Sequence, residues 1–263
     1  MSKRHTYRNI VDKNRFTINA NGDCVAFALG NLQYRASDGK WRFAEHQYDV
    51  LRDGGGQTTP LPQRETQTDW IDLFNYGATG YNNGQTAWQP WTINTGRYDF
   101  YNGNTAGTSA DFSYPYNQQE RANYRTLTDA EWAYVALNRV GERFAKAKVN
   151  GIEGLILIPD GEASGLTSIN VTTSQYTANS ITAEIWNANY EPNGYIFLPC
   201  GGWRNGTSTG ALNTSGYYRA STQNTGSNYW RAYYLQFHNG SSGVTIGNYQ
   251  KSDGLSVRLV MDI

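Results

Sequence analysis

Turn signals between alternating apolar runs constrain the fold of this chain more than any other feature. Apolar residues alternate on both sides of Asn21-Gly22, over residues 16–29. Asp38-Gly39 separates two further runs, and Asn150-Gly151 precedes the apolar run 154–158. Asn-Gly or Asp-Gly between such runs is the strongest short-range signal for a β-hairpin. The sequence therefore predicts three hairpins, with 154–158 as a buried central strand.

Helix signals are few. Thr128 and Glu131 have the spacing of a capping box, and Trp132 and Val135 follow at helical spacing, with Gly141 able to end the helix. The remaining predictions are short helices over 69–74 and 182–189, strands over 195–198 and 256–260, and ordered Gly/Asn/Tyr-rich loops over 77–125 and 201–230. Several hairpins, two main helices and long loops indicate a single α+β domain with small sheets.

Charge and cysteine content exclude several classes of function. The formal net charge is zero, so the attraction to phosphate on which nucleic-acid binding depends is missing. Cys24 and Cys200 lie outside any Cys-x-x-Cys or Cys/His cluster; we expect two buried free thiols, with one disulfide as the alternative. Residues 1–14 are predicted to be a polar lead-in. No long apolar run occurs, so neither a signal peptide nor membrane insertion is expected.

The C-terminal third has an unusual chemistry. Residues 192–252 contain no Asp or Glu, and their fixed charges are Arg204, Arg219, Arg231 and Lys251. General acid–base catalysis by carboxylates and calcium binding both need groups that this segment lacks. Its many Tyr and Trp residues, set among Asn, Ser, Thr and Gly, match the composition of antibody binding loops. We therefore expect a binding protein, with no catalytic residues, no metal and no cofactor.

Several short segments of the sequence resemble those of a known protein family. They include Gly30-Asn-Leu-Gln-Tyr34, Trp41-Arg-Phe-Ala-Glu-His-Gln-Tyr48, Ala145-Lys-Ala-Lys-Val-Asn-Gly151, Tyr234-Leu-Gln-Phe237 and Gly254-Leu-Ser-Val-Arg-Leu-Val260. From about residue 16 to its end, the chain resembles the variable proteins of diversity-generating retroelements from gut Bacteroidetes or their phages. The resemblance implies a C-type-lectin-like fold of the formylglycine-generating-enzyme-like subtype, with small antiparallel sheets, two main helices and long ordered loops.

In that family a reverse transcriptase rewrites adenine-containing codons near the 3′ end of the gene. The resemblance therefore implies one domain over 15–263, made of a scaffold (15–212), a variable ligand-binding region (213–253) and a closing strand (254–263). Relatives commonly read Gly-Tyr-Tyr-Trp-Ser-Ser-Thr where this chain has Gly216-Tyr-Tyr-Arg-Ala-Ser-Thr222. Arg219 and Ala220 are thus candidates for diversified positions, although ordinary drift explains two substitutions nearly as well.

The implied function is ligand or receptor binding on a phage tail or a bacterial cell surface. The partner would be a cell-surface protein or a glycan receptor, and a fibre tip would be a trimer. An undiversified glycan-binding adhesin of the same fold is the main alternative. An enzyme of the formylglycine-generating group and a purely structural virion component are weaker ones. The DNA flanking the gene separates the first two, because diversification requires a reverse transcriptase and a template repeat.

The candidate ligand-binding residues lie in the predicted variable region. They are Tyr218, Arg219, Ala220, Asn224, Thr225, Ser227, Asn228, Tyr229, Trp230, Arg231, Tyr234, Asn239, Ser241, Asn248 and Tyr249. Most of these, including Tyr218, Arg219 and Trp230, are expected to be exposed, although aromatic residues here could also be core. Alternation over 233–238 predicts that Tyr233 faces inward with Leu235 and Phe237, whereas Tyr234, Gln236 and His238 face outward.

Two apparent motifs are discounted. Glu191-Pro192-Asn193 spells the tripeptide that calcium-dependent lectins use for mannose, but it directly precedes an apolar strand and no Trp-Asn-Asp follows. We expect a helix-to-strand turn there. Cys24 and Cys200 do not reproduce the closely placed cysteine pair of the formylglycine-generating enzymes, and a fold does not transfer an activity.

Overall fold

The three hairpins that the turn signals predict are confirmed. Their strand pairs are β1 (Phe16–Thr17) with β2 (Cys24–Phe27), β3 (Leu32–Arg35) with β4 (Lys40–Phe43), and β6 (Phe144–Val149) with β7 (Ile152–Leu157). Asn150 and Gly151 both have positive φ, 47° and 80°. This is the conformation that a two-residue hairpin turn requires, and Asn and Gly are the residues that tolerate it.

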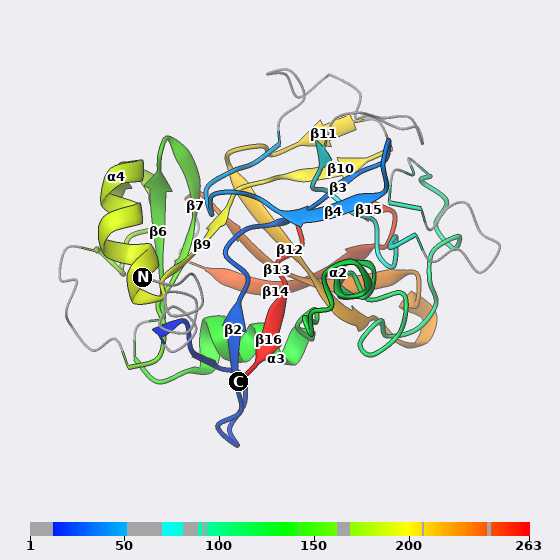
Figure 1. Ribbon diagram of the computed structural model, residues 1–263, viewed down its shortest axis with the longest axis horizontal. Helices are drawn as coiled ribbons and strands as arrows, with labels where there is room; N and C mark the ends of the chain where they lie inside the picture. The colour runs from blue at the N-terminus through cyan, green and yellow to red at the C-terminus, as the bar shows by residue number, and fades with distance from the viewer. Residues whose placement is uncertain are drawn as a thin grey trace.

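The computed structural model describes residues 13–51, 70–80, 89–90, 92, 94–141, 143–161, 169–206, 208–240 and 243–263. These residues form a mixed α+β fold of small sheets and few helices (Figure 1). Besides the hairpin strands, the strands are β5 (Trp70–Ile71), β8 (Ser180–Ile181), β9 (Ile196–Pro199), β10 (Trp203–Asn205), β11 (Ser208–Gly210), β12 (Ser215–Gln223), β13 (Arg231–His238), β14 (Val244–Gln250), β15 (Asp253–Gly254) and β16 (Val260–Asp262). The described sheets have the orders β1-β2-β16, β4-β3-β5, β8-β6-β7-β9, β11-β10-β15 and β12-β13-β14.

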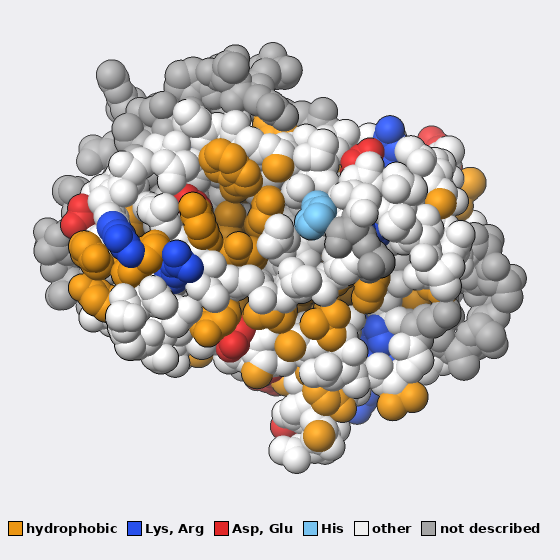
Figure 2. All heavy atoms as spheres, turned by 180° about the vertical axis from the view of Figure 1, so that it is seen from behind, with side chains coloured by type: hydrophobic (Ala, Val, Ile, Leu, Met, Phe, Trp, Pro, Cys, Tyr) orange, Lys and Arg blue, Asp and Glu red, His pale blue; other side chains and the backbone are white. Residues whose placement is uncertain are grey.

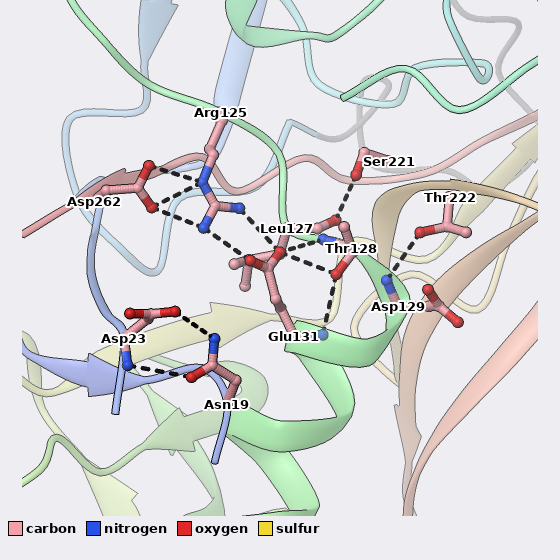
Figure 3. Close-up of polar contacts among 10 residues, drawn as sticks. All are labelled: Asn19, Asp23, Arg125, Leu127, Thr128, Asp129, Glu131, Ser221, Thr222 and Asp262. Carbon is pink, nitrogen blue, oxygen red and sulfur yellow. Dashed lines mark hydrogen bonds and ion pairs between the residues drawn. The ribbon is translucent and has the colours of Figure 1, made fainter. Parts of the chain in front are cut away.

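The predicted capping box starts helix α3 (Asp129–Ala133), which continues as a π-helical turn over Tyr134–Asn138. The Glu131 amide donates to the Thr128 hydroxyl at 3.2 Å, and the Thr128 amide donates to the Glu131 carboxylate at 2.8 Å. Arg125 forks onto the same carboxylate and also pairs with Asp262 at the end of β16 (Figure 3). The cap therefore ties the start of α3 to the C-terminal strand.

Two further helices lie elsewhere in the described chain. Helix α4 (Ala183–Ile185) continues as a π-helical turn over Trp186–Tyr190 and is capped by the Thr182 hydroxyl, so the helix predicted over 182–189 is confirmed. It lies beside the β6, β7 and β9 strands in Figure 1. Helix α2 (Ser113–Glu120) falls inside the predicted loop 77–125 and was missed, because its apolar residues show no helical period.

Three other local predictions are wrong. Residues 70–71 form β5 and not part of a helix, because they pair with β3; Arg35 of β3 and Arg42 of β4 cover the Trp70 ring. Asp69 lies outside the described residues. The predicted loop 201–230 contains β10, β11 and β12. The predicted strand 256–260 is an extended, buried segment that forms isolated bridges before β16 begins at Val260.

The polar lead-in also ends earlier than its predicted boundary at residue 14. Asn14 is buried, and its amide group both donates to and accepts from the backbone of Phe27 in β2. Asn14 therefore belongs to the folded domain, whereas residues 1–12 lie outside the described chain.

The sheet β12-β13-β14 has one face in the core. Helix α3 packs against all three strands, and its Trp132 lies beside Tyr218 of β12. Tyr218, Leu235 and Phe237 belong to the same buried apolar cluster as Trp132. With one face closed in this way, the other face of the sheet is the one that can meet a ligand.

Candidate functional site

The register of the C-terminal sheet decides which side chains share its outer face. Tyr217 is paired with Gln236, Arg219 with Tyr234, and Ala232 with Tyr249. Residues directly opposite each other point to the same side of a sheet. Tyr217, Tyr234, Gln236 and Tyr249 therefore lie on the face away from α3, as the alternation predicts for Tyr234 and Gln236.

A pocket of about 400 Å³ opens on this outer face, between the sheet and the β10-β15 strands. Four aromatic side chains form its walls: Trp203, Tyr217, Tyr234 and Tyr249. Tyr217 and Tyr234 meet edge to face, with ring centroids 5.7 Å apart. Figure 2 shows this side of the molecule, where hydrophobic side chains gather around a hollow and charged side chains are few. A pocket of this size and lining is typical of small-ligand sites.

Glycines make room for two of the aromatic walls. A β-carbon on Gly247 would lie 2.8 Å from the Tyr234 ring, and one on Gly210 would lie 2.5 Å from the Trp203 ring. Both distances are well below van der Waals contact. The two rings can lie flat across β14 and β11 only because residues 247 and 210 have no side chain.

The polar part of the lining consists of amides and one carboxylate. Asn205, Gln236, Gln250 and Asp253 line the pocket beside Leu255. Asn205 Nδ2 donates to Asp253 Oδ1 at 2.7 Å, and burial raises the pKa of the Asp253 carboxyl above its ordinary value. Asp253 is the only carboxylate among the described lining residues. This set can accept and donate several hydrogen bonds to a hydroxyl-rich ligand.

Arg219 lies on the pocket side of the sheet but beneath its surface, so the prediction that it is exposed is wrong. It is fully buried, lies under Tyr234 and against the Tyr76 ring, and donates through Nη2 to the backbone oxygen of Asp253. Burial lowers its pKa to about 10. Its Nε and Nη1 have no hydrogen-bond partner among the described residues. Segments distant in sequence, around Tyr76 and Asp253, cover it.

The prediction of exposure is also wrong for Trp230, which is buried between two arginines. The guanidinium carbon of Arg97 lies 3.4 Å from the Trp230 ring centroid, and that of Arg231 lies 4.4 Å from it. Tyr98, the neighbour of Arg97, stacks on Tyr229 at 5.6 Å. Trp230 is thus the centre of a cation–π cluster at the tip of β13, and the exposed members of the cluster surround it.

Tyr218 and Ala220 belong to the core and not to a binding surface, which corrects two further candidates. Both are buried in the cluster around Trp132. The Tyr218 hydroxyl donates to the Pro199 carbonyl at 2.9 Å and accepts from Asn31 Nδ2. Both side chains face α3, because β12 alternates and its odd-numbered residues, Tyr217 and Arg219, face the pocket.

The remaining candidates divide between two ends of the sheet. The loop between β12 and β13 carries four exposed candidates, Thr225, Ser227, Asn228 and Tyr229, and the partly exposed Asn224. At the same end of the sheet, Arg231 and Asn248 are partly exposed and Tyr249 is 47% exposed. Asn239 is exposed at the opposite end of β13. It follows Arg231 by eight residues, so the two ends lie roughly 26 Å apart at about 3.3 Å per strand residue. Ser241 lies outside the described residues. Of the predicted site residues, the structure therefore places Tyr234 and Tyr249 in the pocket lining, with Arg231 next to Tyr249, and leaves Asn239 out.

Sequence reasoning missed two groups of residues at the site: Tyr217, Gln236, Gln250 and Asp253 inside the predicted variable region, and several residues outside it. Trp203 and Asn205 come from β10, inside a stretch predicted to be a loop, and Arg97 and Tyr98 come from a scaffold loop. Asp253, the first carboxylate after the acid-free segment, was the available signal, because a lone acidic residue ending such a segment stands out.

Among the described residues, neither the two cysteines nor the metal-ligating side chains form a second candidate site. Cys24 and Cys200 are buried and not bonded to each other, so the prediction of two buried free thiols is confirmed. Burial raises the pKa of the Cys200 thiol to about 12, which leaves it protonated and unreactive. No three His, Cys, Asp or Glu side chains of the described chain lie close enough together to hold a metal ion.

Glu191-Pro192-Asn193 forms a single 3₁₀ turn that ends at Gly194, directly before β9. The predicted helix-to-strand turn is confirmed. None of the described helices has the length and apolarity needed to cross a membrane.

Comparison with known proteins gives one match. Residues 162–260 match the model of a family described as a domain of unknown function (DUF8237). This range covers less than half of the chain and includes all of the described residues that line the pocket. Searches of curated proteins and of solved structures gave no match.

Proposed function

We propose that this chain is a non-enzymatic ligand-binding protein that captures a receptor in the pocket walled by Trp203, Tyr217, Tyr234 and Tyr249. The observation that carries the proposal is the coincidence of this 400 Å³ aromatic pocket with the segment 192–252, which contains no Asp or Glu. Tyrosine and tryptophan give large contact areas at low entropic cost and are enriched at the centres of interfaces. The described lining holds one carboxylate, Asp253, and not the pair that acid–base catalysis by carboxylates commonly uses, and this favours binding as the chemistry of the pocket.

The proposal extends to the kind of protein. The fold would be C-type-lectin-like, and the chain a variable protein of a diversity-generating retroelement, displayed on a phage tail or a bacterial cell surface. Its partner would be a cell-surface protein or glycan, and a trimer is expected if it forms a fibre tip. Diversified positions would be outward-facing residues such as Tyr234 and Tyr249, because core packing constrains Tyr218 and Ala220.

The binding test uses labelled full-length chain and a panel of gut Bacteroidetes strains. We expect the double variant Tyr234→Ala/Tyr249→Ala to lose attachment to strains that the wild type binds, with an unchanged melting curve. Tyr114→Ala is the matched control, because Tyr114 is 46% exposed on α2 and lies outside the pocket lining. Equal attachment by the double variant and the control would contradict the proposal.

An undiversified glycan-binding adhesin is the second candidate, and the amide and carboxylate groups of the pocket lining favour it. DNA flanking the gene separates the two. A reverse-transcriptase gene with a near-copy repeat that differs at adenines supports diversification, and the absence of both supports the second candidate.

A further inference from the structure

Buried positive charge surrounds the proposed ligand pocket. Arg219 and Arg204 both interact electrostatically with Asp253, and Arg219 also interacts with Lys251 behind the lining. All three cationic side chains are buried. Against them, the described lining residues contribute only the carboxylate of Asp253. Arg204 and Arg219 therefore add buried positive charge next to the one lining carboxylate, and this charge is felt strongly because water screens buried charges poorly.

Arg219 makes unusually few hydrogen bonds for a buried arginine, as a comparison with the equally buried Arg258 shows. Arg258 donates from Nε, Nη1 and Nη2 to Asn31 Oδ1 and to the carbonyls of Ala28 and Phe197, at 2.9–3.0 Å. Arg219 makes one such bond, and its Nε and Nη1 have no partner among the described residues. Buried polar groups are normally hydrogen-bonded, so Arg219 is an exception: its charge lies beneath the pocket surface with only one hydrogen bond from its guanidinium to a described residue.

A further cation, Arg231, lies next to two residues that line the pocket. Arg231 is the cross-strand partner of Gln250, and its guanidinium lies 5.8 Å from the Tyr249 ring centroid. Gln250 and Tyr249 both line the pocket. Arg231 and Arg97 form no ion pair with any described carboxylate. Both arginines are held by stacking on Trp230, so their charges stay available to a ligand.

The lining also suits a sugar ring. A pyranose presents a face of C–H groups, which packs on aromatic rings such as Tyr234 and Tyr249, and an edge of hydroxyls. The Asp253 carboxylate accepts hydrogen bonds from hydroxyls, and the Gln236 and Gln250 amides both donate and accept them.

We propose that the pocket binds a saccharide unit that carries a carboxylate or sulfate group. The ring packs between Tyr234 and Tyr249, its hydroxyls meet Asp253 and the amides, and the anionic group lies toward Arg231. This inference rests on the proposed function and adds the class of ligand. The positive charge beside and beneath the pocket then contributes selectivity, and the aromatic walls contribute most of the contact area.

The test measures calorimetric binding of the full-length chain to matched pairs of sugars. The pairs are sialyllactose with lactose, digalacturonate with digalactose, and sulfated with unsulfated N-acetyllactosamine. We expect at least one acidic member to bind about tenfold or more tightly than its neutral partner, with a preference that weakens as salt rises. Arg231→Gln should abolish most of this preference. Arg15→Gln, at an exposed arginine whose side chain has no role in the site, should keep it.

The outcomes separate this inference from the proposed function. Equal affinity for acidic and neutral members overturns the anionic preference. If no sugar binds while Tyr249-dependent attachment to cells persists after periodate oxidation of their glycans, the ligand is not a saccharide, yet the proposed function stands. Attachment that does not depend on Tyr234 and Tyr249 removes the proposed function itself.

Discussion

The ring of Tyr234 lies across the backbone of Gly247, the residue directly opposite it on β14. A β-carbon at residue 247 would come within 2.8 Å of that ring. Tyr234 also lies over the buried Arg219, its partner on β12. Gly247 therefore sets the position of the Tyr234 ring, which is both a wall of the pocket and the side chain that covers the buried Arg219.

Replacing Gly247 should damage binding more than folding. In Gly247→Ala the added methyl group displaces the flexible Tyr234 ring, so we expect at least about tenfold weaker ligand binding with a loss of about 1 kcal/mol or less in stability. Cell-attachment titration and denaturant unfolding check both parts. Thr245→Ala, at an exposed position on the same face of β14, is the control and should change neither. Unweakened binding by Gly247→Ala would show that the ring position is unimportant.

Arg219 should contribute little to stability through its charge. The guanidinium is buried with two nitrogens that no described residue pairs with, a cost that an apolar side chain of similar volume avoids, and Arg204 still acts on Asp253 when Arg219 is replaced. We expect Arg219→Met to match the wild type within about 1 kcal/mol or to exceed it. Arg219→Ala leaves a cavity and should lose about 2–5 kcal/mol. Equal losses in the two variants, measured by denaturant unfolding, would mean that the charge itself stabilises the fold.

Lys251 should make stability depend on pH in the alkaline range. Its ammonium donates to the Tyr101 carbonyl and to Gln223 Oε1, and burial together with Arg219 lowers its pKa from 10.5 to about 8. Between these values the unfolded chain binds more protons than the folded one, so the free energy of unfolding contributed by Lys251 rises with pH. Below about pH 8 Lys251 lowers the free energy of unfolding by an amount that no longer changes with pH.

The check is the difference in unfolding free energy between the wild type and Lys251→Met across pH 7–10.5. The subtraction removes the contributions of the buried tyrosines. The wild type should gain relative to the variant as pH rises above about 8. Parallel curves would indicate that Lys251 titrates normally.

The capping box should matter locally. Thr128→Ala removes the hydroxyl that accepts the Glu131 amide and should lower stability by about 1 kcal/mol. Thr128→Ser keeps the hydroxyl and should lose much less. Thermal unfolding of the two variants distinguishes loss of the cap from loss of packing, and equal losses would point to packing.

Local signals made part of the fold predictable. The Asn150-Gly151 turn and the Thr128 cap each act within four residues, so the sequence shows them directly. Alternation in β13 also predicted which face Tyr234 takes. These features need no knowledge of the rest of the chain.

The rest depended on contacts between distant segments. Tyr218 and Arg219 lie on opposite faces of β12, yet both are buried, because α3 covers one face and residues near Tyr76 and Asp253 cover Arg219 on the other. Trp203 reaches the pocket through the pairing of β10 with β15, about fifty residues later in the chain. A period in the sequence shows which residues share a face, but not what packs against that face.

The most direct measurement of the central claim is oxidative footprinting of the chain bound to receptor-positive cells. Tyr249 and Tyr114 are equally exposed in the free protein, at 47% and 46%, so they report on two surfaces with the same starting reactivity. Binding in the pocket predicts that Tyr249 becomes protected while Tyr114 on α2 stays reactive. Protection of Tyr114 with Tyr249 unchanged would place the binding surface elsewhere and contradict the account.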